Sequence, residues 1–485
     1  MARRSSAAAL VSVMAMLSGP AATVARAQAP AGQPGAAATA DGPLVFTTPD
    51  GSRFVLVPDA GVSLVHWAIA TMAHDPPAFP GLCAVTMRAA LGGTWRSGSR
   101  DPERERQALD DHDAAYHTFL GNPADAAAGA ELLRLSKALE QFGDPVAHGR
   151  LLASVPMHRP EVTYDPPVCL YVTTTVPDAL QDVARRLLER REATALRDLQ
   201  AAWVQTVLAR AEQQRQDDRT ALHAEVLALA MPDHPFLRQL ERPGLAAPRR
   251  SEAMATWQAM QRPERTIHVL YGGFDATSAQ AMLQGVFATT GLPPAELLPP
   301  VRARPISSLR RSVVPGARVP TVAIAFVLPP DVDRDVLAVA VHWLADGPDS
   351  RLGQELPRRG RAQATVSCMA PWPRTVDGAS LLLLEVADAG GIEGLADLCR
   401  KAARDVAAAV PTPASLETAL ATVQREWTTA VNDPRQFAMA IAEAALLWPR
   451  RPPPLCPPDR VDAGAVRRLL LQILDTQPVV VEARP

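Results

Sequence analysis

The chain has 485 residues, of which 47% are hydrophobic and 21% are charged. This length and composition are ordinary for a globular protein of two or three domains. A formal net charge of -2 gives no electrostatic reason to expect a nucleic acid or an anionic membrane as a partner.

The N-terminus has the pattern of an export signal. Arg3 and Arg4 precede an apolar run over residues 7–17, and Ala25-Arg26-Ala27 has the small-x-small pattern that signal peptidase cuts. We predict a cleaved signal peptide of the general secretory type over residues 1–27, and therefore a periplasmic or secreted protein. An uncleaved anchor is the alternative, but the apolar run is short for a membrane span. No later segment reaches that length without charges, so we expect no membrane span after cleavage.

Residues 28–42 are rich in Ala, Gly and Pro, and we predict a flexible lead-in there. Five cysteines follow, with no C-x-x-C pair and no zinc-ribbon spacing. An oxidising compartment permits a disulfide, but the odd count leaves at least one thiol unpaired. We expect most of them to be small buried hydrophobic residues.

The first half of the chain alternates strand and helix patterns. Residues 44–57 and 63–72, separated by a turn, predict a hairpin-like opening. A polar segment over about 96–133 predicts a helical insert. The later elements are a strand at 167–174, a long helical region at 177–230, and a strand, Gly-Gly turn and helix within 262–291.

A proline-rich connection separates two halves of similar size, and we place a linker at residues 294–310. The second half repeats the order of the first. Its predicted elements are strands at 321–327, 380–386 and 478–483, with helices near 337–344, 394–410 and 412–431. We therefore predict an α+β fold with two similar α/β domains, at 43–293 and 311–485, each with a mixed sheet plus helices.

Residues 80–94 read PGLCAVTMRAALGGT. This segment resembles the zinc-binding motif of the M16 metallopeptidases (the insulinase, pitrilysin and mitochondrial processing peptidase family), whose usual wording is PGLAHLLEHMLFKGT. The residues that agree are Pro80, Gly81, Leu82, Gly93 and Thr94. The H-x-x-E-H positions fall on Ala84, Met87 and Arg88. The resemblance spans residues 43–485 and implies that the two domains face each other as a clamshell.

These three substitutions remove the chemistry of the motif. Residues at i, i+3 and i+4 share one helix face, where two imidazoles hold zinc and a glutamate activates its water. Ala84 has no lone pair, the thioether of Met87 is a weak acceptor, and the guanidinium of Arg88 stays protonated. We therefore expect zinc to be absent and the protein to have no catalytic residues. Locally, the segment reads as an amphipathic helix that packs Leu82, Val85 and Ala89 inward.

The resemblance implies two further losses. Counting back from Asp217-Asp218 and His234-Pro235-Phe236 places the family's distal zinc ligand, a glutamate, near Arg210 or Ala211, although Glu212 is one step away. A lone glutamate cannot hold zinc in any case.

The second loss lies in the family's substrate-gripping pattern S-R-L-x-x-x-L-R-x-x-x-x-x-x-Y. Ser350, Arg351, Leu352 and Leu356 match it, but Pro357 takes the Arg position and Ala364 takes the Tyr position. Neither side chain can donate a hydrogen bond to a substrate. Three nearby residues are candidate substitutes, with a solvated basic turn as the alternative: Arg358, Arg359 and Arg361.

Two other groups of acidic and histidine residues are weak candidates for a functional site. The acidic and histidine residues of the insert are Asp110, Asp111, His112, Asp113 and His117. His112 and His117 do not share a helix face well, so we favour a solvated helix over a metal site. His223 and Glu225 are two apart and lie on different faces of a predicted helix.

The resemblance implies a non-catalytic M16 homologue, a binding or regulatory subunit that pairs with an active zinc M16 peptidase subunit and handles peptides in the periplasm. An extended peptide is a candidate ligand, held by backbone pairing with a strand edge. Two alternatives stay open. One is a zinc metalloendopeptidase with a rearranged site, and the other is a stand-alone structural or assembly component.

Overall fold

The structure is a computed structural model. The residues that it describes are 42–76, 78–144, 154–158, 160–165, 167–216, 219–234, 236–237, 246–288, 306, 308–346, 350–373, 379–448 and 455–485. The predicted signal peptide, nearly all of the lead-in and most of the predicted linker lie outside this range. Within it, no helix combines the length and the hydropathy needed to cross a bilayer.

The first half forms a six-stranded mixed sheet in the order β1-β2-β6-β3-β5-β4. The strands are β1 (Leu44–Thr47), β2 (Arg53–Pro58), β3 (Val65–Met72), β4 (Glu161–Asp165), β5 (Val168–Thr175) and β6 (Thr266–Gly272). Among these pairs, β2 and β6 are parallel and the others are antiparallel.

The predicted hairpin-like pairing of residues 44–57 with 63–72 is wrong, because β6 lies between β2 and β3. The Gly-Gly turn shows how this insertion is accommodated. A Cβ on Gly272 would lie 1.9 Å from the carbonyl oxygen of Leu64, and Gly272 has a φ of +132°. Only glycine lets the end of β6 approach the start of β3 this closely.

The second half forms a five-stranded sheet in the order β7-β11-β8-β10-β9. Its strands are β7 (Arg310–Pro315), β8 (Thr321–Val327), β9 (Thr365–Trp372), β10 (Leu381–Ala387) and β11 (Val479–Arg484). The parallel pair is β7 with β11, and the other pairs are antiparallel. This order and these directions repeat β2-β6-β3-β5-β4. The predicted α+β fold of two similar halves is therefore confirmed.

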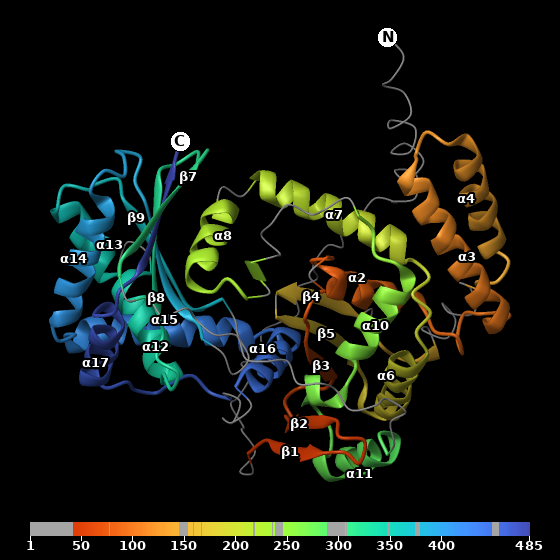
Figure 1. The fold of residues 1–485 in the computed structure, drawn as a ribbon. Coiled ribbons are helices and arrows are strands. Elements are labelled where there is room, and N and C mark those ends of the chain that lie inside the picture. Colours follow the sequence, from red (N-terminus) through yellow and green to blue (C-terminus); the bar gives the residue numbers. More distant parts are fainter. Residues whose placement is uncertain are drawn as a thin grey trace, which may run out of the picture. The chain divides into compact units, whose positions relative to one another are not determined.

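In both halves, helices come between strands along the chain (Figure 1). Those of the first half are α2 (Leu82–Ala89), α3 (Pro102–Gly121), α4 (Ala126–Leu139), α6 (Leu180–Ala193), α7 (Leu199–Gln216), α8 (Arg219–Ala230), α10 (Arg250–Met260) and α11 (Ala276–Val286). Those of the second half are α12 (Arg334–Ala345), α13 (Arg351–Arg358), α14 (Leu395–Ala408), α15 (Pro413–Val431), α16 (Pro434–Leu447) and α17 (Ala463–Leu474). Several begin at an aspartate whose side chain accepts a backbone N–H of the first turn, as Asp101 does for α3 and Asp433 does for α16.

Each half contributes one helix that packs against the sheet of the other half. Phe437, Ile441 and Leu446 of α16 are buried against the first sheet. Leu222, Val226 and Leu227 of α8 are buried against the second sheet. Figure 1 shows α8 beside the strands of the second half and α16 beside β3 and β5. Each of these buried side chains contributes about 1.5–3 kcal/mol of transfer free energy, so both exchanged helices are firmly anchored.

Candidate functional site

The motif segment folds as the short helix α2, and its N-terminus is held from outside the helix. Gly81 is the N-cap residue with a φ of 92° and provides no capping side chain. Asp75 replaces that cap, because its carboxylate accepts the backbone N–H groups of Gly81 and Cys83, both at 2.7 Å. The hydroxyl of Tyr164, on β4, donates to the same carboxylate at 2.6 Å. Burial, together with Asp75, raises the pKa of Tyr164 well above its usual range, which keeps this hydroxyl a donor.

The three motif positions differ in their exposure and contacts. Ala84 is 5% exposed and Met87 is 6% exposed, whereas Arg88 is exposed. The Met87 sulfur accepts a weak hydrogen bond from the Gln261 amide at 3.8 Å. The predicted inward packing of Leu82, Val85 and Ala89 is confirmed, since all three are buried in the core of the first half. A methyl group and a thioether therefore occupy the two inner positions as packing groups.

Helix α7 supplies the side chain that meets the third motif position. The Arg88 guanidinium donates to the Thr206 hydroxyl at 3.4 Å, and that hydroxyl donates to the carbonyl of Ala202 at 2.8 Å. Thr206 lies one turn before Arg210, whose side chain is outside the described residues, and Ala211 offers only a methyl group. The sequence-derived position of the distal ligand, near Arg210 or Ala211, stays a prediction, and the contact of Thr206 with Arg88 is one that the sequence did not indicate. The group that α7 presents to Arg88 is thus a hydroxyl and not a carboxylate.

Below α2, a cavity of about 30 Å³ is bordered by Met87, Thr71, Tyr171 and His268. It has room for a water molecule or two and not for a peptide. Burial, and to a lesser degree the charge of Arg191, lowers the pKa of His268 to about 3. Its Nδ1 lies 3.2 Å from the Trp67 indole N–H, which donates to it. This histidine is therefore a neutral core residue.

The second predicted binding region lies at the end of α13. Pro357 is exposed and Ala364 is partly buried against the second core. Arg359 pairs with Glu355 and Asp405, both at 2.9 Å. These carboxylates raise the pKa of Arg359, with Glu355 the larger cause.

The other two arginines of this region differ in how closely they contact acidic and carbonyl groups of the protein. Arg361 lies 3.1 Å from Asp388 and donates to the carbonyl of Gly391 at 2.9 Å. The side chain of Arg358 is 69% exposed and 3.5 Å from Glu355. Arg358 thus has the weakest contacts with the rest of the protein. A substrate contact by any of the three arginines stays a prediction.

The acidic and histidine residues of the insert contact different side chains and not a common centre. Asp110 pairs with Arg250 at 2.6 Å, and Asp113 accepts from the Gln200 amide at 2.8 Å. His112 lies 3.0 Å from the Ser136 hydroxyl. Residues 110–117 thus stabilise the packing of α3 against its neighbours.

Among the described residues, three potential metal ligands approach one another at one place: His342, Asp346 and Glu426. Asp346 is 2.6 Å from Nδ1 of the imidazole and Glu426 is 3.2 Å from Nε2. A histidine binds a metal through one nitrogen. The two carboxylates flank opposite nitrogens, so this arrangement fits an ion pair and not a metal centre.

His223 has a partner that sequence reasoning missed. On α8 it contacts Glu385 of β10, and Arg219 lies 3.3 Å from the same carboxylate. Glu225 takes no part in this contact. The pair joins residues 162 positions apart, so no local pattern could have indicated it.

No family model and no curated protein matches the chain. Solved structures do share its fold. A protease from Helicobacter pylori matches with a TM-score of 0.62 at 12% identity, over 91% of this chain and 99% of its own. The peptidase M16 inactive domain from Pseudomonas fluorescens matches with a TM-score of 0.62 at 15% identity, over 91% and 98%.

A protein from Alicyclobacillus acidocaldarius described as M16-like matches with a TM-score of 0.55 at 11% identity, again over 91% and 98%. At such low identities the likeness shows the fold alone. The chain has the fold of these three proteins, two of them described as M16 or M16-like, over nearly its whole described length.

Proposed function

We propose that this chain is an exported, non-catalytic homologue of the M16 peptidases that acts by binding. The observation that supports this proposal is the composition of the motif face: a methyl group at Ala84, a thioether at Met87, a guanidinium at Arg88 and a hydroxyl at Thr206. Catalytic zinc takes three protein ligands from His, Glu, Asp or Cys. Nothing in this set can replace them, and a fixed cation at Arg88 opposes a dication. One solved structure with the same fold is named as an inactive M16 domain.

The proposed role is that of a binding or regulatory subunit, paired in the periplasm with an M16 peptidase that retains its zinc. The sheets offer a means of holding a peptide. In the described part of the chain, β4 pairs only with β5, and β9 pairs only with β10, so each sheet ends in a strand with one free edge. Extended peptides bind such edges through backbone hydrogen bonds. Glu161 and Thr163 of β4 are exposed, so one face of this edge strand is open to solvent.

Zinc content and peptidase activity test the loss of catalysis. The purified mature protein should carry far less than one equivalent of zinc and should not cleave peptides, with or without added zinc. Near-stoichiometric zinc, together with cleavage that a chelator abolishes, would make the chain a metallopeptidase with a rearranged site and overturn the proposal.

Affinity purification of the tagged full chain from its native host tests the partner. We expect a partner that carries an intact H-x-x-E-H motif, and peptidase activity that increases when this chain is added back. A stable partner without that motif would instead identify an assembly component.

A further inference from the structure

A second cavity lies between α3, the end of α6 and the start of α10, with a volume of about 310 Å³. Its polar lining includes Arg106, Arg191, Thr194 and Arg250, and its flat apolar walls are Trp95 and Trp257. It shares Arg191 and Trp257 with the small cavity below α2, but it contains none of the three motif positions.

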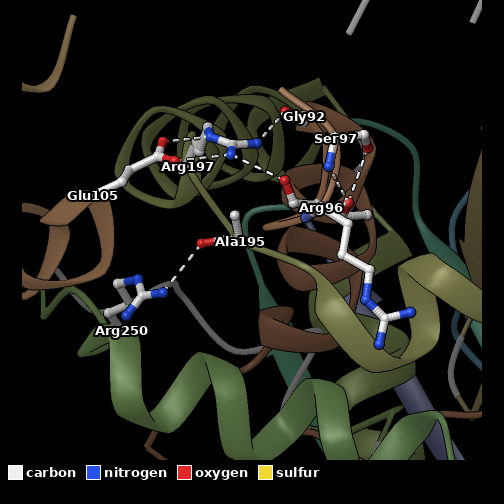
Figure 2. A network of polar contacts seen from close by, with 8 residues as sticks. Gly92, Arg96, Ser97, Glu105, Ala195, Arg197 and Arg250 are labelled. Atoms are coloured by element: carbon white, nitrogen blue, oxygen red, sulfur yellow. Dashed lines mark hydrogen bonds and ion pairs between the residues drawn. The ribbon is translucent and has the colours of Figure 1, made fainter. Parts of the chain in front are cut away.

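The wall that carries Trp95 is held rigidly. Figure 2 shows Arg197 donating to the carbonyl of Gly92 while it pairs with Glu105 of α3. Arg197 also donates to the carbonyl of Thr94, and the two donor–acceptor distances are 3.2 Å to Gly92 and 3.1 Å to Thr94. Thr94 also forms an antiparallel bridge with Thr194. The cavity is therefore a preformed feature of the fold.

Several buried polar atoms of this lining have no hydrogen-bond partner within the described part of the chain. They are Nε of Arg250, which is 7% exposed, the hydroxyl of Thr194, which is 3% exposed, and Nε of Arg191. Buried donors without partners are costly, and native proteins rarely keep them. Three of the residues around one cavity share this property, which indicates that the cavity normally holds a polar guest.

The charges favour an anion as that guest. Arg191 is compensated by Asp50 at 2.8 Å, and Arg250 by Asp110 at 2.6 Å. Glu192, a carboxylate of the lining itself, lies 3.7 Å from Arg96.

Arg106 has no acidic partner among the described residues. Its guanidinium carbon lies 5.1 Å from the centre of the Trp95 ring, which also has Arg250 at 5.3 Å. The surplus positive charge is thus next to a flat aromatic wall.

We propose that this cavity binds a small organic anion, with its carboxylate or phosphate group held by Arg106, Nε of Arg250 and the Thr194 hydroxyl, and its flat apolar part against Trp95 and Trp257. Guanidinium groups recognise both oxyanions by charge-assisted hydrogen bonds. The volume is at the small end of ligand sites, so it fits a single-ring molecule and excludes a folded partner. The site does not depend on the state of the M16 motif.

Calorimetric titration of the full-length mature chain with benzoate and with phenyl phosphate tests the proposal, and neutral benzamide is the comparison ligand. We expect saturable binding of at least one anion and much weaker binding of benzamide. Arg106→Gln should weaken anion binding about tenfold. Thr194→Val, which keeps the side-chain shape, should weaken it about fivefold.

Arg104→Gln is the matched control, because Arg104 is an exposed residue on the same helix and its charge faces Asp101. That variant should bind as tightly as the unmodified chain. The proposal is overturned if neither anion binds saturably at millimolar concentration, if benzamide binds equally well, or if folded Arg106→Gln and Thr194→Val proteins keep full affinity. Any of these results would leave ordered water as the guest.

Discussion

At the residue scale, Asp75 stabilises the N-terminus of α2, the helix that carries the motif positions. Its carboxylate satisfies two backbone donors of the first turn and the hydroxyl of Tyr164. Asp75→Ala leaves these buried donors without a partner and should lower the free energy of unfolding by about 2–3 kcal/mol. Urea denaturation followed by circular dichroism measures the change.

Asp101→Ala is the control for this prediction, because Asp101 caps the more exposed helix α3 through a single bond to the Arg104 N–H. Its cost should be about 1 kcal/mol. Equal costs for the two variants would show that Asp75 is an ordinary surface cap.

Rebuilding the motif is the second test at this scale. The triple variant Ala84→His, Met87→Glu, Arg88→His should remain inactive and should not gain tight zinc binding. Two imidazoles on one helix face provide only two ligands, and the α7 side chain in contact with position 88 is the Thr206 hydroxyl, which is not a carboxylate. Zinc equivalents after dialysis and peptide turnover are the measurements. Turnover by the triple variant would show that the other losses have been misplaced.

Adding Thr206→Glu to the triple variant places a carboxylate beside position 88. We expect this fourth change to tighten zinc binding at least tenfold, by the usual effect of a third ligand. Adding Ala211→Glu instead is the matched control and should have no effect, because Ala211 is five residues after Thr206 and so points to a different side of α7. If the Ala211→Glu version binds zinc and the Thr206→Glu version does not, the distal position derived from the sequence is the correct one.

The sequence was sufficient to place Ala84, Met87 and Arg88 on one helix, because the frame around them is local. It could not indicate Asp75, Thr206 or Thr194. Each of these acts through a partner that is distant in the chain or through a cavity formed by several elements. The predicted roles of Arg359 and Arg361 also needed the structure, because their acidic partners Asp405 and Asp388 lie 46 and 27 residues away.

At the element scale, strands buried on both faces were predictable, and two of the edge strands were not. The observed β8 (Thr321–Val327) and β10 (Leu381–Ala387) agree with the predicted ranges to within a residue or two, since their apolar runs are continuous. The edge strands β4 and β9 were missed because one side of each is exposed and polar residues interrupt the pattern. The position of β6 between β2 and β3 depends on long-range pairing that periodicity does not report.

Helix α8 is joined to the second sheet by the contact of His223 with Glu385. The carboxylate of Glu385 is buried, and its pKa is lowered despite that burial, because His223 and then Arg219 stabilise the charged form. Glu385→Gln should lower the free energy of unfolding at neutral pH by about 2 kcal/mol, the usual value for a hydrogen bond to a charged group.

The pH dependence has a definite sign. Because the folded-state pKa lies below the ordinary value of 4.5, the stabilisation is present above pH 4.5 and is lost as the pH falls through the folded-state value. The difference between wild type and Glu385→Gln should therefore shrink in acid. Glu225→Gln, on the same helix and without a part in the pair, should change stability by less than about 0.5 kcal/mol at any pH. A constant difference down to strongly acidic pH would contradict the ion-pair account.

At the scale of the whole molecule, the exchanged helices make the halves mutually dependent. One face of the first sheet is covered by α16 from the second half, and one face of the second sheet is covered by α8 from the first. A half without its partner would expose that apolar face. Exposed patches of this kind promote aggregation. The likeness of the two halves could be predicted from the repeated order of elements, but this exchange could not, because α8 and α16 are ordinary apolar helices by sequence.

Separating the halves tests this dependence. Residues 43–293 and 311–485, produced alone, should be poorly soluble, and the two fragments produced together should co-purify as a folded pair. In the intact chain, Ile441→Asp puts a charge between α16 and the first sheet and should destabilise both halves by more than about 3 kcal/mol, because a buried unpaired charge is among the most costly substitutions. Unfolding would stay a single transition.

The exposed surface of the same helix supplies the control, since Ala440→Asp changes a solvent-facing residue beside Ile441 and should cost less than about 1 kcal/mol. Tryptophan fluorescence and circular dichroism should report coincident urea transitions in every variant, because the halves can unfold only together. If the 43–293 fragment alone is soluble, monomeric and cooperatively folded, then the contribution of α16 to the first sheet is dispensable, and the two halves are independent domains.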